Sequence, residues 1–217
     1  MTSPSPLAIL LERRLSTERL GPYRAAAGGD LERALQLYQW NATVGSAFLE
    51  TLGHLEVVLR NALHEQLAGW HAAQQLPGEW YDDPAGALDR HRRDDIAAAR
   101  VRIRREGKAE TPGKVVAELM FGFWRFLLDK HYQPTLWAQT LRHAFPYLLP
   151  QRRVEVYDPV YALVRFRNRV AHHEPVHHLP LRARHEDMLR VAGYIDPAVE
   201  AWLSRITRVP ALLGGKP

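Results

Sequence analysis

Apolar side chains recur along most of this chain with the spacing of an α-helix. The clearest run lies between residues 44 and 67, where each step between apolar positions is three or four residues. One face of a helix repeats with that period, so the run predicts a long amphipathic helix. Its members are Val44, Phe48, Leu52, Leu55, Leu59, Leu63 and Leu67. In front of it, Asp30 is a good N-cap for a helix over 31–40, and Asn41 and Thr43 are suited to cap a restart.

Proline and glycine divide the rest of the chain into further predicted helices. Residues 77–86 contain two prolines and two glycines, which indicate a loop. No stretch alternates apolar and polar residues as a half-buried strand does. The pattern therefore predicts an all-α fold, a single helical bundle. Beyond the loop we expect helices over 94–108, 113–130, 136–145, 151–173, 182–191 and 197–208.

The chain is long enough for one domain with additional segments. We divide it into an N-terminal helical segment over 1–29, a helical domain over 30–209 and a flexible tail over 210–217. No apolar run is long enough to span a bilayer, so membrane association is not expected.

Composition and charge narrow the class of protein. The 217 residues include no cysteine, which excludes disulfides and thiolate metal ligands and favours a cytoplasmic location. The formal net charge is +5 and the pI is near 9.7. Cationic side chains gain by displacing counterions from phosphates, so a nucleic acid is a candidate partner. Basic proteins that bind no nucleic acid can have the same net charge. The charge alone therefore does not decide whether this protein binds nucleic acid.

The stretch RFRNRVAHHEPVHH, residues 165–178, concentrates cationic and titratable side chains at the predicted end of a helix. On that helix Asn168 and His172 lie one turn apart, and Arg165 lies on the same face. Arg167 is offset around the helix but has a long side chain. A histidine can move the proton of a 2′-hydroxyl, and a guanidinium can hold a phosphate. These are the groups that RNA cleavage without a metal or cofactor requires, and no carboxylate cluster for magnesium is nearby.

The residues RNRVAH, 167–172, resemble the motif of HEPN ribonucleases, in which four residues separate an arginine from a histidine. The continuation HHEP resembles the Abi-like (abortive infection AbiD/AbiF) branch of these proteins. QWNATVGSAFLETLGHLEVVLRNAL is similar to the N-terminal block of that branch, and GKVVAELMFGFWRFLL with LWAQTLRHAF is similar to its middle block. The resemblance covers about residues 30–175.

This resemblance implies a HEPN-type bundle with extra N- and C-terminal helices, expected to form a homodimer whose two motif helices build one cleft. It implies a metal-independent endoribonuclease of an abortive-infection (phage defence) or toxin-type system, with RNA as partner and an antitoxin or associated non-coding RNA as a further one. Arg167 would hold the phosphate, Asn168 would orient it and His172 would act as acid or base. The motif often continues into an arginine and an aromatic residue, where this chain has Glu174-Pro175-Val176. Supporting roles fall to Arg165, His173, Glu174, Glu56 and Arg60.

Simpler interpretations stay open for each of these residues. Arg167 and His172 are also suited to stabilise a helix C-terminus. Glu56 and Arg60 have the spacing of an ordinary ion pair on a solvated helix face. A metal site would need His172, His173, His177 and His178 to converge.

Two further groups of residues could contact RNA, one of arginines and one of aromatic residues. Arg93, Arg100 and Arg104 form the best stripe for holding an RNA backbone, although a solvated face explains them too. Phe121, Phe123, Trp124 and Phe126 belong to the most apolar predicted helix and are expected in the core.

The alternative to the enzyme is a catalytically silent HEPN module that binds RNA or a partner protein. A helical DNA-binding protein is the third class, and no convincing helix-turn-helix supports it.

Overall fold

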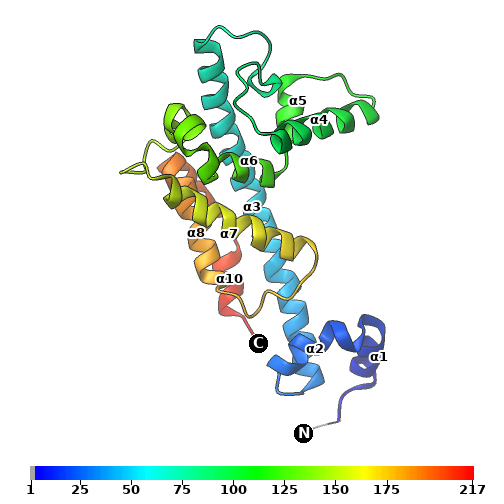
Figure 1. Ribbon diagram of the computed structural model, residues 1–217. Helices are drawn as coiled ribbons and strands as arrows, with labels where there is room; N and C mark the ends of the chain where they lie inside the picture. The colour runs from blue at the N-terminus through cyan, green and yellow to red at the C-terminus, as the bar shows by residue number, and fades with distance from the viewer. Residues whose placement is uncertain (1–2) are drawn as a thin grey trace.

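Helix α3 (Leu31–Ala73) runs the length of the molecule and the other elements are arranged along it (Figure 1). The computed structural model describes residues 3–217, which contain helices, short helical turns and loops but no strand. The all-α prediction is confirmed. The other elements are α1 (Pro6–Leu15), α2 (Thr17–Ala26), η1 (Trp80–Asp82), α4 (Arg90–Arg105), α5 (Pro112–Glu118), α6 (Phe121–Leu127), η2 (Lys130–Tyr132), η3 (Gln133–Trp137), η4 (Leu141–Ala144), α7 (Arg153–Ala171), α8 (Leu181–Ile195), α9 (Pro197–Ile206) and α10 (Val209–Gly214).

The 43 residues of α3 span about 65 Å at the rise of an α-helix. Its start is the predicted one, because a carboxylate oxygen of Asp30 accepts a hydrogen bond from the backbone N–H of Arg33 at 3.0 Å. The seven apolar side chains predicted to share a face are all at most 1% exposed. The predicted restart is wrong. Thr43 bonds back to the Gln39 carbonyl, and Asn41 is buried and serves a distant loop.

The apolar helix predicted over 113–130 is two helices, α5 and α6, with the break at Leu119 and Met120. At the break, side chains of other residues donate hydrogen bonds to backbone carbonyls that have no partner within the helix. Arg102 of α4 donates to the Glu118 carbonyl at 2.7 Å, and the Trp124 indole donates to the Leu119 carbonyl at 3.1 Å. Of the four aromatic residues expected in the core, three are buried. Phe126 is 37% exposed, and the guanidiniums of two arginines cover its ring.

Two other segments differ from their predicted form. Residues 136–145 are not one regular α-helix, because residues 136 and 137 end the turn η3 and residues 141–144 form the separate turn η4. The start of the tail, expected to be flexible, forms α10, and the Trp40 indole of α3 donates to the Leu212 carbonyl at 2.8 Å. The predicted N-terminal helical segment consists of α1 and α2 at one end of α3 (Figure 1). Within residues 3–217 no helix combines the length and the apolar character needed to cross a membrane.

Helix α7 carries the arginine–histidine stretch and packs antiparallel on α3. Phe166 meets Phe48 edge to face with ring centroids 4.7 Å apart, and one turn further Val170 meets Gly45. A Cβ atom on Gly45 would lie 3.0 Å from Val170 Cγ1. The absence of a side chain at residue 45 therefore sets how closely the end of α7 approaches α3.

Candidate active site

Helix α7 ends in a tight reversal of the chain. The N–H of His173 bonds to the Val170 carbonyl at 2.9 Å, and the N–H of Glu174 bonds to the Arg169 carbonyl at 2.8 Å. This pair of bonds is the Schellman motif, which needs a left-handed residue at the position of His173. The φ of His173 is accordingly 56°. An ion pair of 3.1 Å between Arg169 and Glu174 closes the same turn.

One face of α7 presents polar groups to solvent up to the helix end. Arg165, Asn168 and His172 are exposed on this face, as their spacing predicts. Arg165 donates to the Tyr161 hydroxyl at 3.2 Å. Among residues 3–217 the side chains of Asn168 and His172 have no hydrogen-bond partner. They are free to meet a ligand.

Arg167 lies on a different side of α7, near Glu56 and Arg60 of α3. Helical side chains lean toward the N-terminus of their own helix, so Arg167 and Glu56 lean toward each other across the antiparallel pair. Burial raises the pKa of Glu56, while the charges of Arg167 and Arg60 and a backbone hydrogen bond from Phe121 oppose that rise. Arg60 also donates to the Ala117 carbonyl at 3.4 Å. Arg167 and Arg60 thus lie within electrostatic range of a half-buried carboxylate, although neither forms an ion pair with Glu56 among the described residues.

Arg167 and His172 point in different directions around the axis of α7. They are five residues apart, which corresponds to a rotation of about 140° between the two side chains. No hydrogen bond within the described chain joins the two side chains. One copy of this helix therefore cannot readily present both groups to a single phosphate.

The loop after the motif is fixed by Asn41. Its side-chain oxygen accepts hydrogen bonds from the backbone N–H groups of Val176 at 2.8 Å and His177 at 3.1 Å. Val176 is fully buried, and Lys216 donates to the His177 carbonyl at 2.8 Å. Val176, one of the residues at 174–176 where the chain differs from the motif it resembles, thus helps to dock the loop on α3 by its burial.

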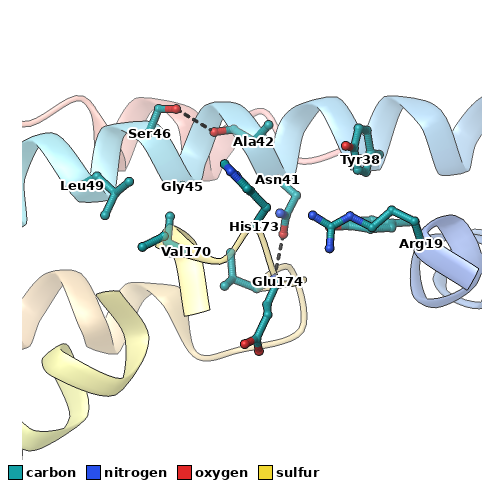
Figure 2. A pocket seen from close by; sticks show the side chains of 13 residues that line it. Arg19, Tyr38, Asn41, Ala42, Gly45, Ser46, Leu49, Val170, His173 and Glu174 are labelled. Atoms are coloured by element: carbon teal, nitrogen blue, oxygen red, sulfur yellow. Dashed lines mark hydrogen bonds between the residues drawn. The ribbon is translucent and has the colours of Figure 1, made fainter. Parts of the chain in front are cut away.

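A pocket of about 280 Å³ lies between α2, α3 and this loop (Figure 2). His173 reaches into it from the loop, and Arg19 reaches toward it from α2. Glu174 also lines it, although its carboxylate points away from α3. No sequence pattern singled out Arg19, Tyr23 and Asn41 as site residues, because only the tertiary packing brings α2 and α3 to the motif.

The basic stripe of α4 lies elsewhere and its charges are paired. Arg93 lies 3.6 Å from Asp83, and Arg104 lies 3.9 Å from Glu110. Arg100 pairs with Asp82 and, at 3.0 Å, with Glu110. These carboxylates offset the positive charge that the sequence suggested for an RNA backbone.

The four histidines of the stretch do not converge. His172, His173 and His178 are exposed, whereas His177 is buried and packs on Tyr23 with ring centroids 4.9 Å apart. Burial lowers the pKa of His177, and the charges of His178 and Lys216 lower it further. Over residues 3–217 no group of three or more histidine, aspartate or glutamate side chains is placed to hold a metal ion.

We compared the chain with known protein families, proteins and structures. No protein-family model, no curated protein and no solved structure matches this chain.

Proposed function

We propose that the protein is a metal-independent endoribonuclease of the Abi-like HEPN type, acting in phage defence or as a toxin. One observation carries the proposal. Arg169, Glu174 and Asn41 perform the capping, ion pairing and loop docking at the end of α7, while the described chain gives the side chains of Asn168 and His172 no partner. The end of α7 is therefore held without the side chains of Asn168 and His172, which stay in solvent where a substrate can meet them.

The chemistry assigned to these residues is a transesterification. His172 accepts the proton of the 2′-hydroxyl, and the 2′-oxygen attacks the phosphorus as the bond to the 5′-oxygen breaks. The proton passes to the leaving 5′-oxygen, so the products are a 2′,3′-cyclic phosphate and a 5′-hydroxyl. Arg167 stabilises the charge that builds on the phosphate, and Asn168 orients the reacting groups.

The angle between Arg167 and His172 favours a cleft made by two copies of the chain. In a two-fold dimer the arginine of one copy and the histidine of the other can face one phosphate. The charge of Glu56 on the neighbouring helix attracts Arg167 and favours its position there. An antitoxin or an associated RNA is a further partner that the family resemblance suggests.

The test is RNA cleavage with EDTA present. We expect the parent protein to cut a mixed RNA pool and His172→Ala to be slower by about two orders of magnitude or more at nearly unchanged RNA affinity. Arg167→Ala should lose cleavage and some affinity. The matched control is His178→Ala, because His178 is exposed beyond the motif. Cleavage that EDTA abolishes and magnesium restores would refute the metal-free chemistry.

Mixed dimers test the composite cleft. A dimer that combines an Arg167→Ala copy with a His172→Ala copy keeps one intact arginine and one intact histidine on opposite subunits. We expect the mixture to recover cleavage that neither variant has alone. Mixtures as inactive as the separate variants, or a fully active monomer in light scattering, would contradict the composite cleft.

The second candidate is a silent HEPN module, and the position of Arg167 favours it. Arg167 lies with Glu56 and Arg60 and away from His172, as a structural arginine would. A parent protein that binds RNA tightly and cuts none of it would establish this alternative.

A further inference from the structure

A groove between α4 and the break that joins α5 to α6 has a mostly apolar lining. Helix α4 lies beside α5 in this part of the molecule (Figure 1). The groove has a volume of about 210 Å³, and Leu119, Phe123 and Phe126 form part of its wall. Met120 also lines it and is 61% exposed. Apolar side chains that gather in an open concavity mark interaction sites, and methionine adapts to the shape of a partner.

Arg92 brings a positive charge into this groove. Its side chain is only 8% exposed, and its guanidinium lies over the Phe126 ring, 3.9 Å from the centroid. The Nε atom donates to Asp95 at 2.9 Å. The two Nη atoms form no hydrogen bond within residues 3–217, and both keep some accessible surface. Burying a charge is costly unless its donors are used, and a carboxylate that accepts from both Nη atoms would use them.

Arg102 gives the groove a second cationic group. It lies ten residues after Arg92 on α4, which corresponds to about 15 Å along the helix axis. Its Nε and Nη2 atoms donate to Glu118, whereas its Nη1 atom makes no hydrogen bond to any other described residue. The one acid in the lining, Asp95, is paired with Arg92. The arginines therefore outnumber the acids, and the complementary ligand is negatively charged.

A peptide suits these features better than RNA or a small molecule does. The separation of about 15 Å between the two arginines is the span of about four or five extended residues. The volume of about 210 Å³ is below the range of about 300–1,000 Å³ that is typical of small-ligand pockets. RNA would present a phosphate at every nucleotide to a wall that is mostly apolar and contains the carboxylate of Asp95.

We infer that this groove binds an acidic segment of a partner protein. A large apolar side chain of the segment packs against Met120 and Phe126, and a neighbouring carboxylate accepts hydrogen bonds from Arg92. None of the residues that line the groove belongs to the stretch 165–178, so this binding site does not depend on the proposed ribonuclease activity.

Gly122 allows the groove to be filled with little effect on the fold. It lines the groove, and a Cβ atom there would have no other atom within 4 Å. Gly122→Met therefore places a side chain in the groove, and a helix prefers methionine to glycine. The matched control is Gly113→Met in α5, where a Cβ atom is equally unhindered and the residue is exposed outside the lining. Neither change should lower the melting temperature.

Met120→Ser is a second variant that does not depend on filling the groove. Its matched control is Leu7→Ser, because Leu7 on α1 is 62% exposed and lies outside the groove. Serine at either position removes apolar surface that is already in water, so both variants should fold like the parent protein.

The first measurement is selection of a display library of random short peptides on the immobilised full chain. We expect the selected peptides to share an aspartate or glutamate next to a large apolar residue. Calorimetric titration with one selected peptide should then give one site per chain, with weaker binding at higher salt. Replacing the acid of the peptide by its amide should weaken binding by about tenfold or more.

The variants locate the site of that peptide. We expect Gly122→Met to weaken peptide binding by about tenfold or more and Met120→Ser to weaken it several-fold, while both controls bind like the parent. Equal affinity in all variants would overturn the inference, and so would an amide peptide that binds as tightly as the acid.

Other occupants of the groove give different results. Binding of 3-phenylpropionate as tight as that of the peptide would show a small-molecule site. Self-association of the protein that Gly122→Met abolishes would show a surface for a second copy. A 2′-O-methyl oligonucleotide whose binding Gly122→Met weakens, with no peptide selected, would show an RNA surface. Each of these three results would refute the peptide site, and RNA cleavage by the parent bears on none of them.

Discussion

Replacing His173 by glycine should stabilise the protein, because this residue closes α7 in a left-handed conformation. The φ of 56° costs a residue with a side chain about 1–2 kcal/mol. Glycine has no such cost, but it loses more entropy on folding, by about 0.5–1 kcal/mol. The exposed imidazole makes no hydrogen bond or ion pair within residues 3–217, so its removal breaks no such contact. The expected net gain is about 0.5–1 kcal/mol.

Thermal and urea unfolding measure this gain. For a chain of this length about 1 kcal/mol corresponds to a rise of about 2–4 °C in melting temperature. Ala171→Gly is the matched control, because Ala171 is exposed and still helical. Glycine there should destabilise the protein by up to about 1 kcal/mol. If His173→Gly were as destabilising as Ala171→Gly, the left-handed residue would not be strained and the histidine would have a structural role.

Two further predictions concern stability. Burial lowers the pKa of His177 and of His185 in the folded protein, so the unfolded chain takes up protons first as the pH falls through about 6.5. Their contribution is complete above that pH, and the melting temperature should fall between pH 7.5 and 5.5; a flat profile would contradict this. Gly45→Val places a branched side chain against Val170 and should cost about 1–3 kcal/mol in urea unfolding, through overpacking of the α3–α7 contact. Full stability of that variant would show that α7 can move away from α3 without loss.

Local sequence patterns were sufficient to predict the helices and helix ends that depend on neighbouring residues only. The apolar spacing over 44–67 predicted the buried stripe of α3, and Asp30 predicted its start. The same reasoning failed where distant residues decide. The break between α5 and α6 has no proline or glycine at Leu119 and Met120, and it is stabilised by Arg102 from another helix.

The candidate site shows the same division. The shared face of Arg165, Asn168 and His172 follows from helical periodicity within one segment. The neighbourhood of Arg167 and Glu56 requires knowledge of how α3 and α7 pack, which spacing does not contain. Arg19 and Tyr23 lie about 150 residues from the motif and enter the pocket only because α2 folds back on α3.

The link between Asn41 and the loop also determines which substitutions this region tolerates. The donors are main-chain N–H groups at residues 176 and 177, so many side chains other than proline can make the same bonds. The acceptor is one side-chain oxygen, which few residue types can supply in a buried position. In a saturation mutagenesis screen, position 41 should therefore be intolerant without any compensating change at 176 or 177. An essential contact of this kind leaves no pairwise covariation between the positions that it joins.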